Sequence, residues 1–213
     1  LVAMRRELHQ YPELSNEAYE TTARIRTWLE EAGVRLLDLR LPTGVLAEVK
    51  GARPGPTILL RADIDALPIA EQTGLPFASK VPGKMHACGH DFHTAAIIGA
   101  AELLQARADE LHGTVRLLFQ PAEELAVGAR AVIEAGALEG VSAVFGMHNN
   151  PELPVGTVGI RTGPMTASVD RFDISVQGKG GHAGVPEAAV DPVVITSAIV
   201  TALQTLVSRN ASP

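Results

Sequence analysis

The spacing of apolar residues predicts alternating helices and strands over residues 1–150. From Thr22 to Ala32, apolar or small side chains recur every three or four positions, which is typical of one face of an amphipathic helix. The nearly continuous apolar run 114–119 is typical of a buried strand. We therefore expect helices at 1–10, from Ser15 or Asn16 to Gly33, at 93–108 and at 128–135, and strands at 34–39, 45–49, 57–62, 114–119 and 143–147.

This alternation predicts an α/β fold in which a mostly parallel sheet carries helices on both faces. Sites in open sheets of this kind lie at the carboxyl ends of the strands. Polar residues that directly follow a predicted strand should therefore meet at one edge of the sheet. They are Asp63, Asp65, Glu123, Glu124 and His148.

A different pattern begins near Ser168, where we expect a second, α+β domain. Residues 169–177 alternate apolar and polar side chains, which is typical of a half-exposed antiparallel strand. A loop with four glycines follows at 178–184, and an Asp-Pro pair then opens a helix predicted for 191–208.

Composition and charge argue against several kinds of partner and structure. The 213 residues carry a net charge of −6 without a basic run, which argues against a nucleic-acid or anionic-membrane partner. A single cysteine excludes an internal disulfide, and no apolar run approaches the roughly 20 residues that span a bilayer.

The chain begins at Leu1 inside a predicted helix and ends at Pro213 directly after another predicted helix. We therefore expect a fragment of a longer protein. A cytoplasmic location is a separate expectation.

The densest candidate chemistry lies in Met85–Thr94, which holds three of the seven histidines and the only cysteine. Gly89 lets the backbone turn tightly enough for Cys88 and His90 to face one centre. A divalent metal ion would ionise the thiol, so we interpret the pair as metal ligands. Two alternatives stay open: an inert buried cysteine beside a hydrogen-bonded histidine, and a nucleophilic cysteine with His90 or His148 as its base.

Glu123 and Glu124 follow a predicted strand as neighbours. Adjacent glutamates can divide the work of a metal hydrolase, one binding metal while the other takes a proton from water. They could also merely begin a helix, where acidic residues suit the helix dipole. His148 follows another strand and is interpreted as a ligand, the alternative being a satisfied core histidine. A thiol hydrolase does not need the glutamate pair, which favours the metal hydrolase.

Asp63 and Asp65 have the two-residue spacing that places both carboxylates on one side of an extended segment. We expect them to orient ligands rather than bind metal, with turn chemistry before Pro68 as the alternative. His182 lies in the glycine-rich loop, where it could stabilise an oxyanion or bind a substrate carboxylate, or simply be an exposed loop residue.

The other histidines carry weaker signals. His86 should lie near the site in an ambiguous role. His93 should begin a helix and support a ligand. His9 and His112 are interpreted as ordinary surface or packing residues.

Six stretches along the chain together resemble the M20 family of metallopeptidases. The resemblance is to its amidohydrolase branch, which includes hippurate hydrolases, auxin-conjugate hydrolases and N-acetyl-diaminopimelate deacetylases. The stretches are Leu8–Ser15, Leu60–Pro68, Met85–Thr94, Gln120–Glu124, Gly146–Asn149 and Gly178–Pro186.

The resemblance implies a site for two divalent metal ions (Zn, Mn, Ni or Co) that hydrolyses the amide bond of N-acyl amino acids or similar small conjugates. Cys88 would be the bridging ligand, His90, Glu124 and His148 further ligands, and Glu123 the general base. A carboxypeptidase or dipeptidase of the same family, and a metal-binding relative without turnover, are the alternatives.

The resemblance also implies the domain organisation. Residues 1–167 would be the first part of a zinc-peptidase-type catalytic domain, and 168–213 the beginning of an inserted ferredoxin-like lid that forms a homodimer. His182 would then reach the active site of the partner subunit. Because the family's catalytic domain resumes after the lid, a final histidine ligand should lie beyond residue 213.

Overall fold

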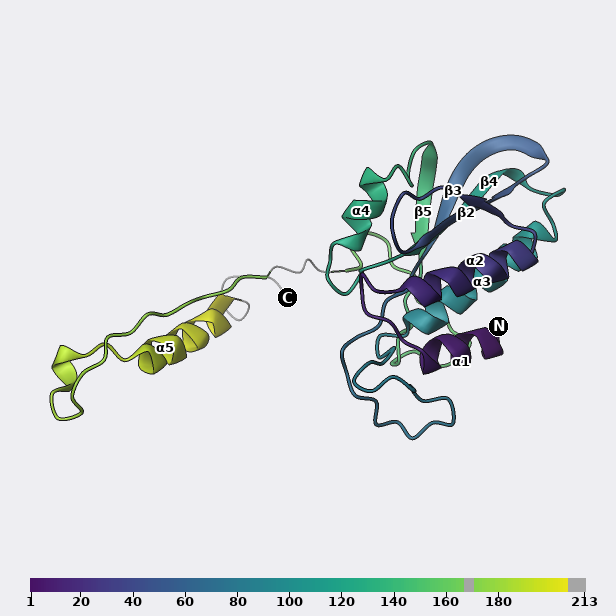
Figure 1. Ribbon diagram of the computed structural model, residues 1–213. Helices are drawn as coiled ribbons and strands as arrows, with labels where there is room; N and C mark the ends of the chain where they lie inside the picture. The colour runs from purple at the N-terminus through teal and green to yellow at the C-terminus, as the bar shows by residue number, and fades with distance from the viewer. Residues whose placement is uncertain (167–170, 207–213) are drawn as a thin grey trace. The chain divides into compact units, whose positions relative to one another are not determined.

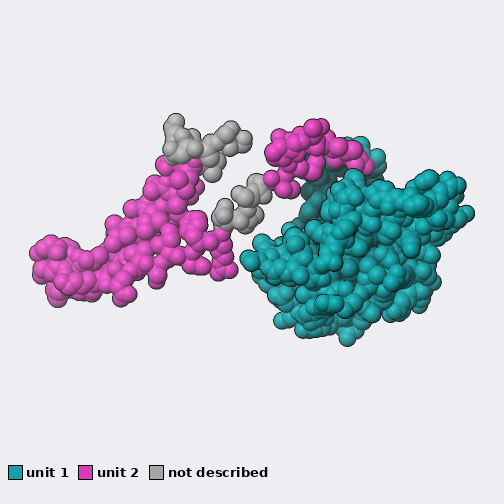
Figure 2. All heavy atoms as spheres, turned by 90° about the horizontal axis from the view of Figure 1, so that it is seen from above, with its two compact units in different colours: residues 1–157 teal, residues 158–213 magenta. Residues whose placement is uncertain are grey.

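The computed structural model describes residues 1–166 and 171–206 and divides the chain into two compact units, 1–157 and 158–213. Figures 1 and 2 show the two units. The domain boundary expected at Ser168 falls among the residues outside the described ranges and stays a prediction.

The first unit is built on a mixed five-stranded sheet with the strand order β1-β2-β4-β3-β5. β3 pairs in parallel with both β4 and β5, whereas β2 pairs antiparallel with β1 and β4. The strands are β1 (Arg35–Leu37), β2 (Val45–Lys50), β3 (Arg53–Asp63), β4 (His112–Gln120) and β5 (Val141–Gly146).

The expectation of a mostly parallel sheet is therefore wrong. The physical reason is the length of the connections at the start of the chain. Residues 51–52 alone separate β2 from β3, and a parallel crossover needs a dozen residues or more, so these two strands must run in opposite directions. Only the later strands, which are separated by helices, run parallel.

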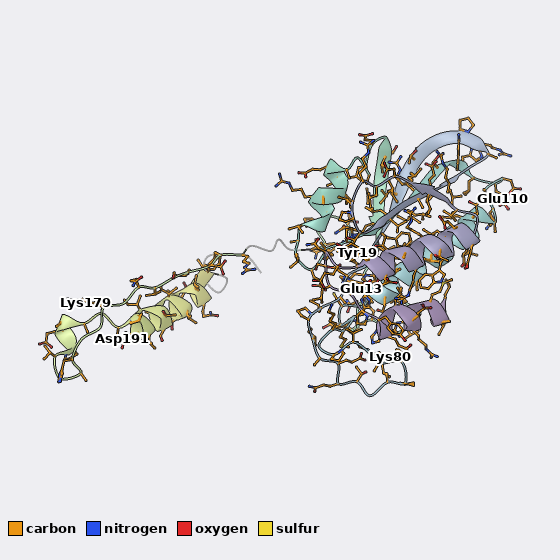
Figure 3. All side chains as sticks on the ribbon, viewed as in Figure 1. Glu13, Tyr19, Lys80, Glu110, Lys179 and Asp191 are labelled. Carbon is orange, nitrogen blue, oxygen red and sulfur yellow. The ribbon has the colours of Figure 1, made fainter. Side chains whose placement is uncertain are left out.

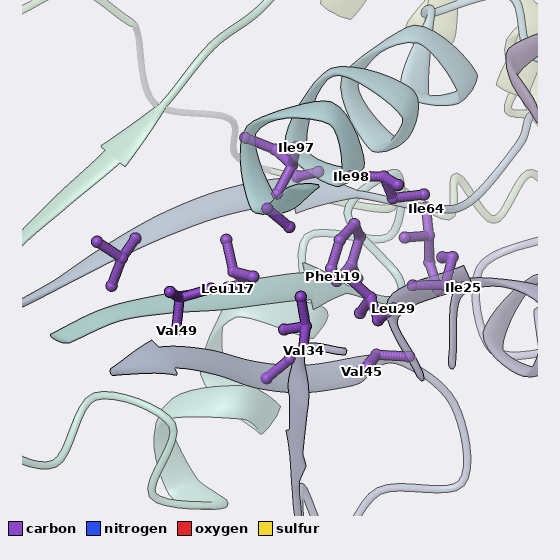
Figure 4. Packing of buried hydrophobic residues seen from close by; sticks show 14 of the residues in the cluster. Ile25, Leu29, Val34, Val45, Val49, Ile64, Ile97, Ile98, Leu117 and Phe119 are labelled. Carbon is purple, nitrogen blue, oxygen red and sulfur yellow. The ribbon is translucent and has the colours of Figure 1, made fainter. Parts of the chain in front are cut away.

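Helices cover both faces of the sheet, as predicted (Figure 1). Along β4, Leu117 and Phe119 pack into a core with Ile25 and Leu29 on one face (Figure 4). Leu118 packs into a second core on the other face. Fully burying a side chain such as Phe119 contributes about 1.5–3 kcal/mol. The helices α2 (Tyr19–Glu31) and α3 (His90–Gln105) lie on the first face, and α1 (Val2–Gln10) packs against α3. The helix α4 (Gly128–Glu134) lies on the second face.

The predicted start of α2 near Ser15 or Asn16 is wrong, because the helix begins at Tyr19. The Ser15 hydroxyl does not cap the helix and instead donates to Asp65, 2.8 Å away. The carboxylate of Glu13 takes its place, accepting the backbone N–H of Thr21 at 2.6 Å (Glu13 and Tyr19 are labelled in Figure 3). A side chain outside the helix thus satisfies one of its free N–H groups.

The second unit contains a short 3₁₀ helix, η1 (Pro186–Ala188), and α5 (Pro192–Thr205). Asp191 caps α5 by accepting the backbone N–H of Val193 at 2.8 Å, which confirms the predicted start of this helix. The strand predicted for 169–177 is not found at 171–177, and its first two residues lie outside the described ranges. Alternating residues make a strand only when a partner strand pairs with them. Across the described ranges, no helix combines the length and apolar character that crossing a bilayer requires.

Candidate metal centre

The carboxyl ends of β3, β4 and β5 bring the predicted site residues together. β3 and β4 end in register, with Asp63 opposite Gln120, and β5 ends beside them at Gly146. Among the residues that the structure describes, three groups of potential ligands result, each with its donor atoms within 4.8 Å of one another, and all three contain His90. They are Cys88, His90 and His148; His90, Glu123 and Glu124; and Asp63, His90 and His93. The predicted convergence at one edge of the sheet is confirmed.

His90 lies at the centre of the site, at the first turn of α3, with 1% of its side chain exposed. Its Nε2 atom is 3.7 Å from Asp63 Oδ2, 3.8 Å from Glu123 Oε2 and 3.7 Å from Glu124 Oε1. Among the described residues, Nε2 has no hydrogen-bond partner, which is costly for a buried polar atom. Ligands of one zinc ion, each about 2.0–2.3 Å from the metal, lie roughly 3–4 Å apart. The arrangement therefore fits a metal ion.

Cys88 supports the same interpretation. Its Sγ atom lies 3.3 Å from His148 Nε2. Burial, followed by the negative charges of Glu124 and Glu123, raises the pKa of the Cys88 thiol to about 11. A nucleophilic cysteine needs a lowered pKa, so these surroundings disfavour that alternative, whereas a divalent cation would stabilise the thiolate. His148 itself is exposed, which rules out the core-histidine alternative.

Asp65 holds the two glutamates in place through their backbone N–H groups. Its Oδ1 atom accepts the backbone N–H of Glu123 at 3.2 Å, and its Oδ2 atom accepts those of Glu124 at 3.0 Å and the Ser15 hydroxyl at 2.8 Å. Burial alone would raise the pKa of Asp65, but His90, Ser15 and these amides outweigh it and lower the pKa. The buried carboxylate is thus ionised and holds both glutamates by their backbone.

Asp63 is held in a similar way. Arg61 Nη1 donates to Oδ2 at 2.6 Å, and His93 Nδ1 lies 2.6 Å from Oδ1. Burial would raise the pKa of Asp63, yet the His93 hydrogen bond and the charges on His90 and Arg61 together lower it to about 2. Both aspartates are buried and form hydrogen bonds to site residues, so the turn-chemistry alternative for this pair is wrong.

Sequence reasoning missed His9, which is not an ordinary surface or packing residue. It is buried, with Nδ1 2.8 Å from Asp91 Oδ2 and Nε2 3.2 Å from Glu71 Oε1, so it ties α1 to the start of α3. Its place in the Leu8–Ser15 stretch was the available signal. His86 is also buried, which lowers its pKa to about 4, while His112 is exposed as expected.

His182 belongs to the second unit, where its Nδ1 atom accepts the backbone N–H of Gly184 at 3.0 Å. Its side chain is exposed. A role for His182 at the metal centre stays a prediction.

Thiol, imidazole and carboxylate groups that converge at the carboxyl edge of an α/β sheet define a metal-dependent hydrolase type of site. Comparison with known proteins agrees. The model of peptidase family M20/M25/M40 matches residues 59–212, and the chain belongs to this family.

Two curated relatives and one solved structure show the range of similarity. An N-acetylcysteine deacetylase of Bacillus subtilis is 63% identical over the whole chain, which covers 56% of that protein. The IAA-amino acid hydrolase ILR1-like 5 of Arabidopsis thaliana is 47% identical, again over the whole chain and over 49% of the relative. The structure of the YXEP protein of Bacillus subtilis, described as a dinuclear metal binding peptidase from the M20 family, matches with a TM-score of 0.76 and 66% sequence identity. The match covers 76% of this chain and 46% of the YXEP chain. The chain thus spans about half the length of these relatives.

Proposed function

We propose that the intact protein is a metal-dependent amidohydrolase that cleaves the amide bond of N-acyl amino acids or similar small conjugates. The observation that carries the proposal is the buried His90 Nε2 atom, which faces Asp63, Glu123 and Glu124 and has no hydrogen-bond partner among the described residues. The similarity to an N-acetylcysteine deacetylase and an IAA-amino acid hydrolase supports the substrate class.

Cys88, His90, Glu124 and His148 are the residues proposed to hold two divalent ions, which could be Zn, Mn, Ni or Co. Once bound, these ions would polarise the amide carbonyl and lower the pKa of the attacking water. The mixture of thiol, imidazole and carboxylate donors suits these borderline metals, and the choice among them then depends on availability.

The two glutamates differ in a way that supports their separate roles. The Glu124 side chain is 19% exposed, its Oε1 atom is buried without a hydrogen-bond partner among the described residues, and burial raises its pKa. A bound cation would give Oε1 a partner and would stabilise the ionised carboxylate. The Glu123 side chain is 41% exposed and therefore accessible to water and substrate. We assign Glu124 to metal binding and Glu123 to proton transfer, taking a proton from water and passing it to the leaving amine.

The remaining parts of the proposal concern assembly. Residues 1–167 would belong to the catalytic domain and 168–213 to a ferredoxin-like lid through which two subunits form a homodimer. His182 would then act on the substrate bound by the partner subunit, stabilising the developing oxyanion or binding the substrate carboxylate. Partners other than a small-molecule substrate and a second copy, such as nucleic acid or a membrane, are not expected.

Matched glutamine variants of the intact protein test the division of roles. Glu123→Gln should keep its metal content and lose turnover of N-acyl amino acids by about 100-fold or more, the usual scale for a general base. Glu124→Gln should lose metal as well. The control is Glu110→Gln, at an exposed residue paired with Arg107, which should change neither.

Three results would contradict the assignment. Near-normal turnover in Glu123→Gln would show that Glu123 is not the general base. Faster turnover of peptides than of N-acyl amino acids would indicate a carboxypeptidase or dipeptidase, and metal binding without turnover of any substrate would indicate a binding protein.

A further inference from the structure

His93 lies one turn after His90 on α3 and is fully buried. Both of its ring nitrogens are engaged. Nδ1 lies 2.6 Å from Asp63 Oδ1, at the end of β3, and Nε2 accepts the backbone N–H of Asn149 at 3.0 Å. One imidazole thus joins α3, the end of β3 and the segment that follows β5.

The partners fix the protonation state of the ring. A backbone N–H can only donate, so His93 Nε2 must present its lone pair to Asn149. The ring proton then lies on Nδ1 and is donated to Oδ1 of Asp63. The other carboxylate oxygen of Asp63, Oδ2, accepts a hydrogen bond from Arg61. His93 is therefore a neutral imidazole with a single tautomer, and neither nitrogen is left to bind a metal ion.

The contact with Asn149 bears directly on the neighbouring candidate ligand. The rings of His93 and His148 meet edge to face, with centroids 4.6 Å apart. The ring of His90 also stacks on the ring of His93, with centroids 5.5 Å apart. Asn149 also packs against Gly89, where any Cβ atom would overlap its side chain. The segment after β5 is thus fitted closely against the loop that carries Cys88.

We propose that His93 is a positioning residue that ties the Asn149 amide to Asp63 and so fixes His148 relative to Cys88 and His90. His93 does this without binding metal itself. The position of the segment can be tested in the metal-free protein, and only the expected effect on turnover rests on the proposed function.

Two amide substitutions separate the two contacts of the ring. In His93→Gln, the side-chain oxygen reaches the position of Nε2 and can still accept from Asn149, while the donor to Asp63 is lost. In His93→Asn, the side-chain NH₂ reaches the position of Nδ1 and can still donate to Asp63, while the acceptor for Asn149 is lost.

The direct measurement is hydrogen exchange of the Asn149 amide in the metal-free intact protein. Exchange should be about tenfold faster in His93→Asn than in His93→Gln, the scale of one lost hydrogen bond. With metal bound, turnover should fall about 10- to 100-fold in His93→Asn, the usual scale for a group that orients a ligand, and less in His93→Gln. The same substitutions at the exposed His112 are the control.

Imidazole ¹⁵N NMR of the unsubstituted protein needs no variant and does not depend on how well the variants fold. It should show a neutral His93 ring with its proton on Nδ1, both before and after metal addition. Direct coordination of His93 by metal would overturn the proposal, as would equal Asn149 exchange in the two variants. If Asn149 exchange differs as expected but the unsubstituted protein hydrolyses no N-acyl amino acid, the proposed function fails and the positioning role stands.

Discussion

Asp65→Asn is the most informative single change because it preserves shape and removes one hydrogen-bond acceptor from the centre of the site. The carboxylate accepts three hydrogen bonds, two of them at Oδ2, from Ser15 and Glu124. An asparagine can keep those two with its single oxygen. Its NH₂ group must then face the Glu123 N–H, so donor meets donor.

The magnitude follows from that mismatch. A buried donor left without its acceptor costs about 1–3 kcal/mol, and the opposite orientation of the amide would leave two donors unpaired. The free energy of unfolding should therefore fall by at least about 1 kcal/mol. Since the backbone of Glu123, the proposed general base, loses its anchor, turnover should also fall about 10- to 100-fold.

Denaturant unfolding of the metal-free intact protein, followed through the fluorescence of Trp28 on α2, measures the stability change as a shifted midpoint. Asp38→Asn is the matched control, because Asp38 is 78% exposed and surface changes of this kind stay within about 0.5 kcal/mol. Equal stability and equal turnover in the two variants would show that Asp65 does not organise the glutamates.

Three further predictions concern the core, the site's charge and the lid. Phe119→Ala should lower the free energy of unfolding by about 3–5 kcal/mol, and the same change at the 44% exposed Phe92 by much less; similar losses measured by denaturant unfolding would contradict the core described here. Because the pKa of Asp63 is lowered to about 2 in the folded state, its contribution of about 2 kcal/mol is present above pH about 4 and should be lost as pH falls toward 2; acid titration of stability checks this, and Asp63→Asn should flatten that part of the curve. Mixing the inactive variants Glu123→Gln and His182→Ala should restore turnover when subunits exchange, and exchange without recovery would place His182 outside the partner's site.

Local patterns predicted the parts of the structure that depend on local physics. The periodic spacing of Ile25 and Leu29 identified the buried face of α2, and the polar residues after strands marked the edge where the site forms. Those inferences need only the repeat of a helix or strand and the rule for parallel sheets.

What the patterns missed depends on distant partners. Ser15 looks like a helix cap, yet its hydroxyl bonds to Asp65, fifty positions along the chain. His9 looks unremarkable until folding brings Asp91 to its ring. The direction of β2 was missed for a different reason: β3 begins at Arg53 rather than at 57, and the two residues left between the strands are too few for a parallel crossover.

The central claim is that a divalent metal held by these residues drives amide hydrolysis, and metal removal tests it most directly. The intact protein should be stripped with a chelator, assayed on a panel of N-acyl amino acids, and titrated with Zn²⁺, Mn²⁺, Co²⁺ or Ni²⁺. Turnover should vanish on stripping and return as two ions bind per chain, and Cys88→Ser should bind them poorly. Full turnover in the metal-free protein, lost only when the Cys88 thiol is alkylated, would contradict the account and establish a cysteine nucleophile instead.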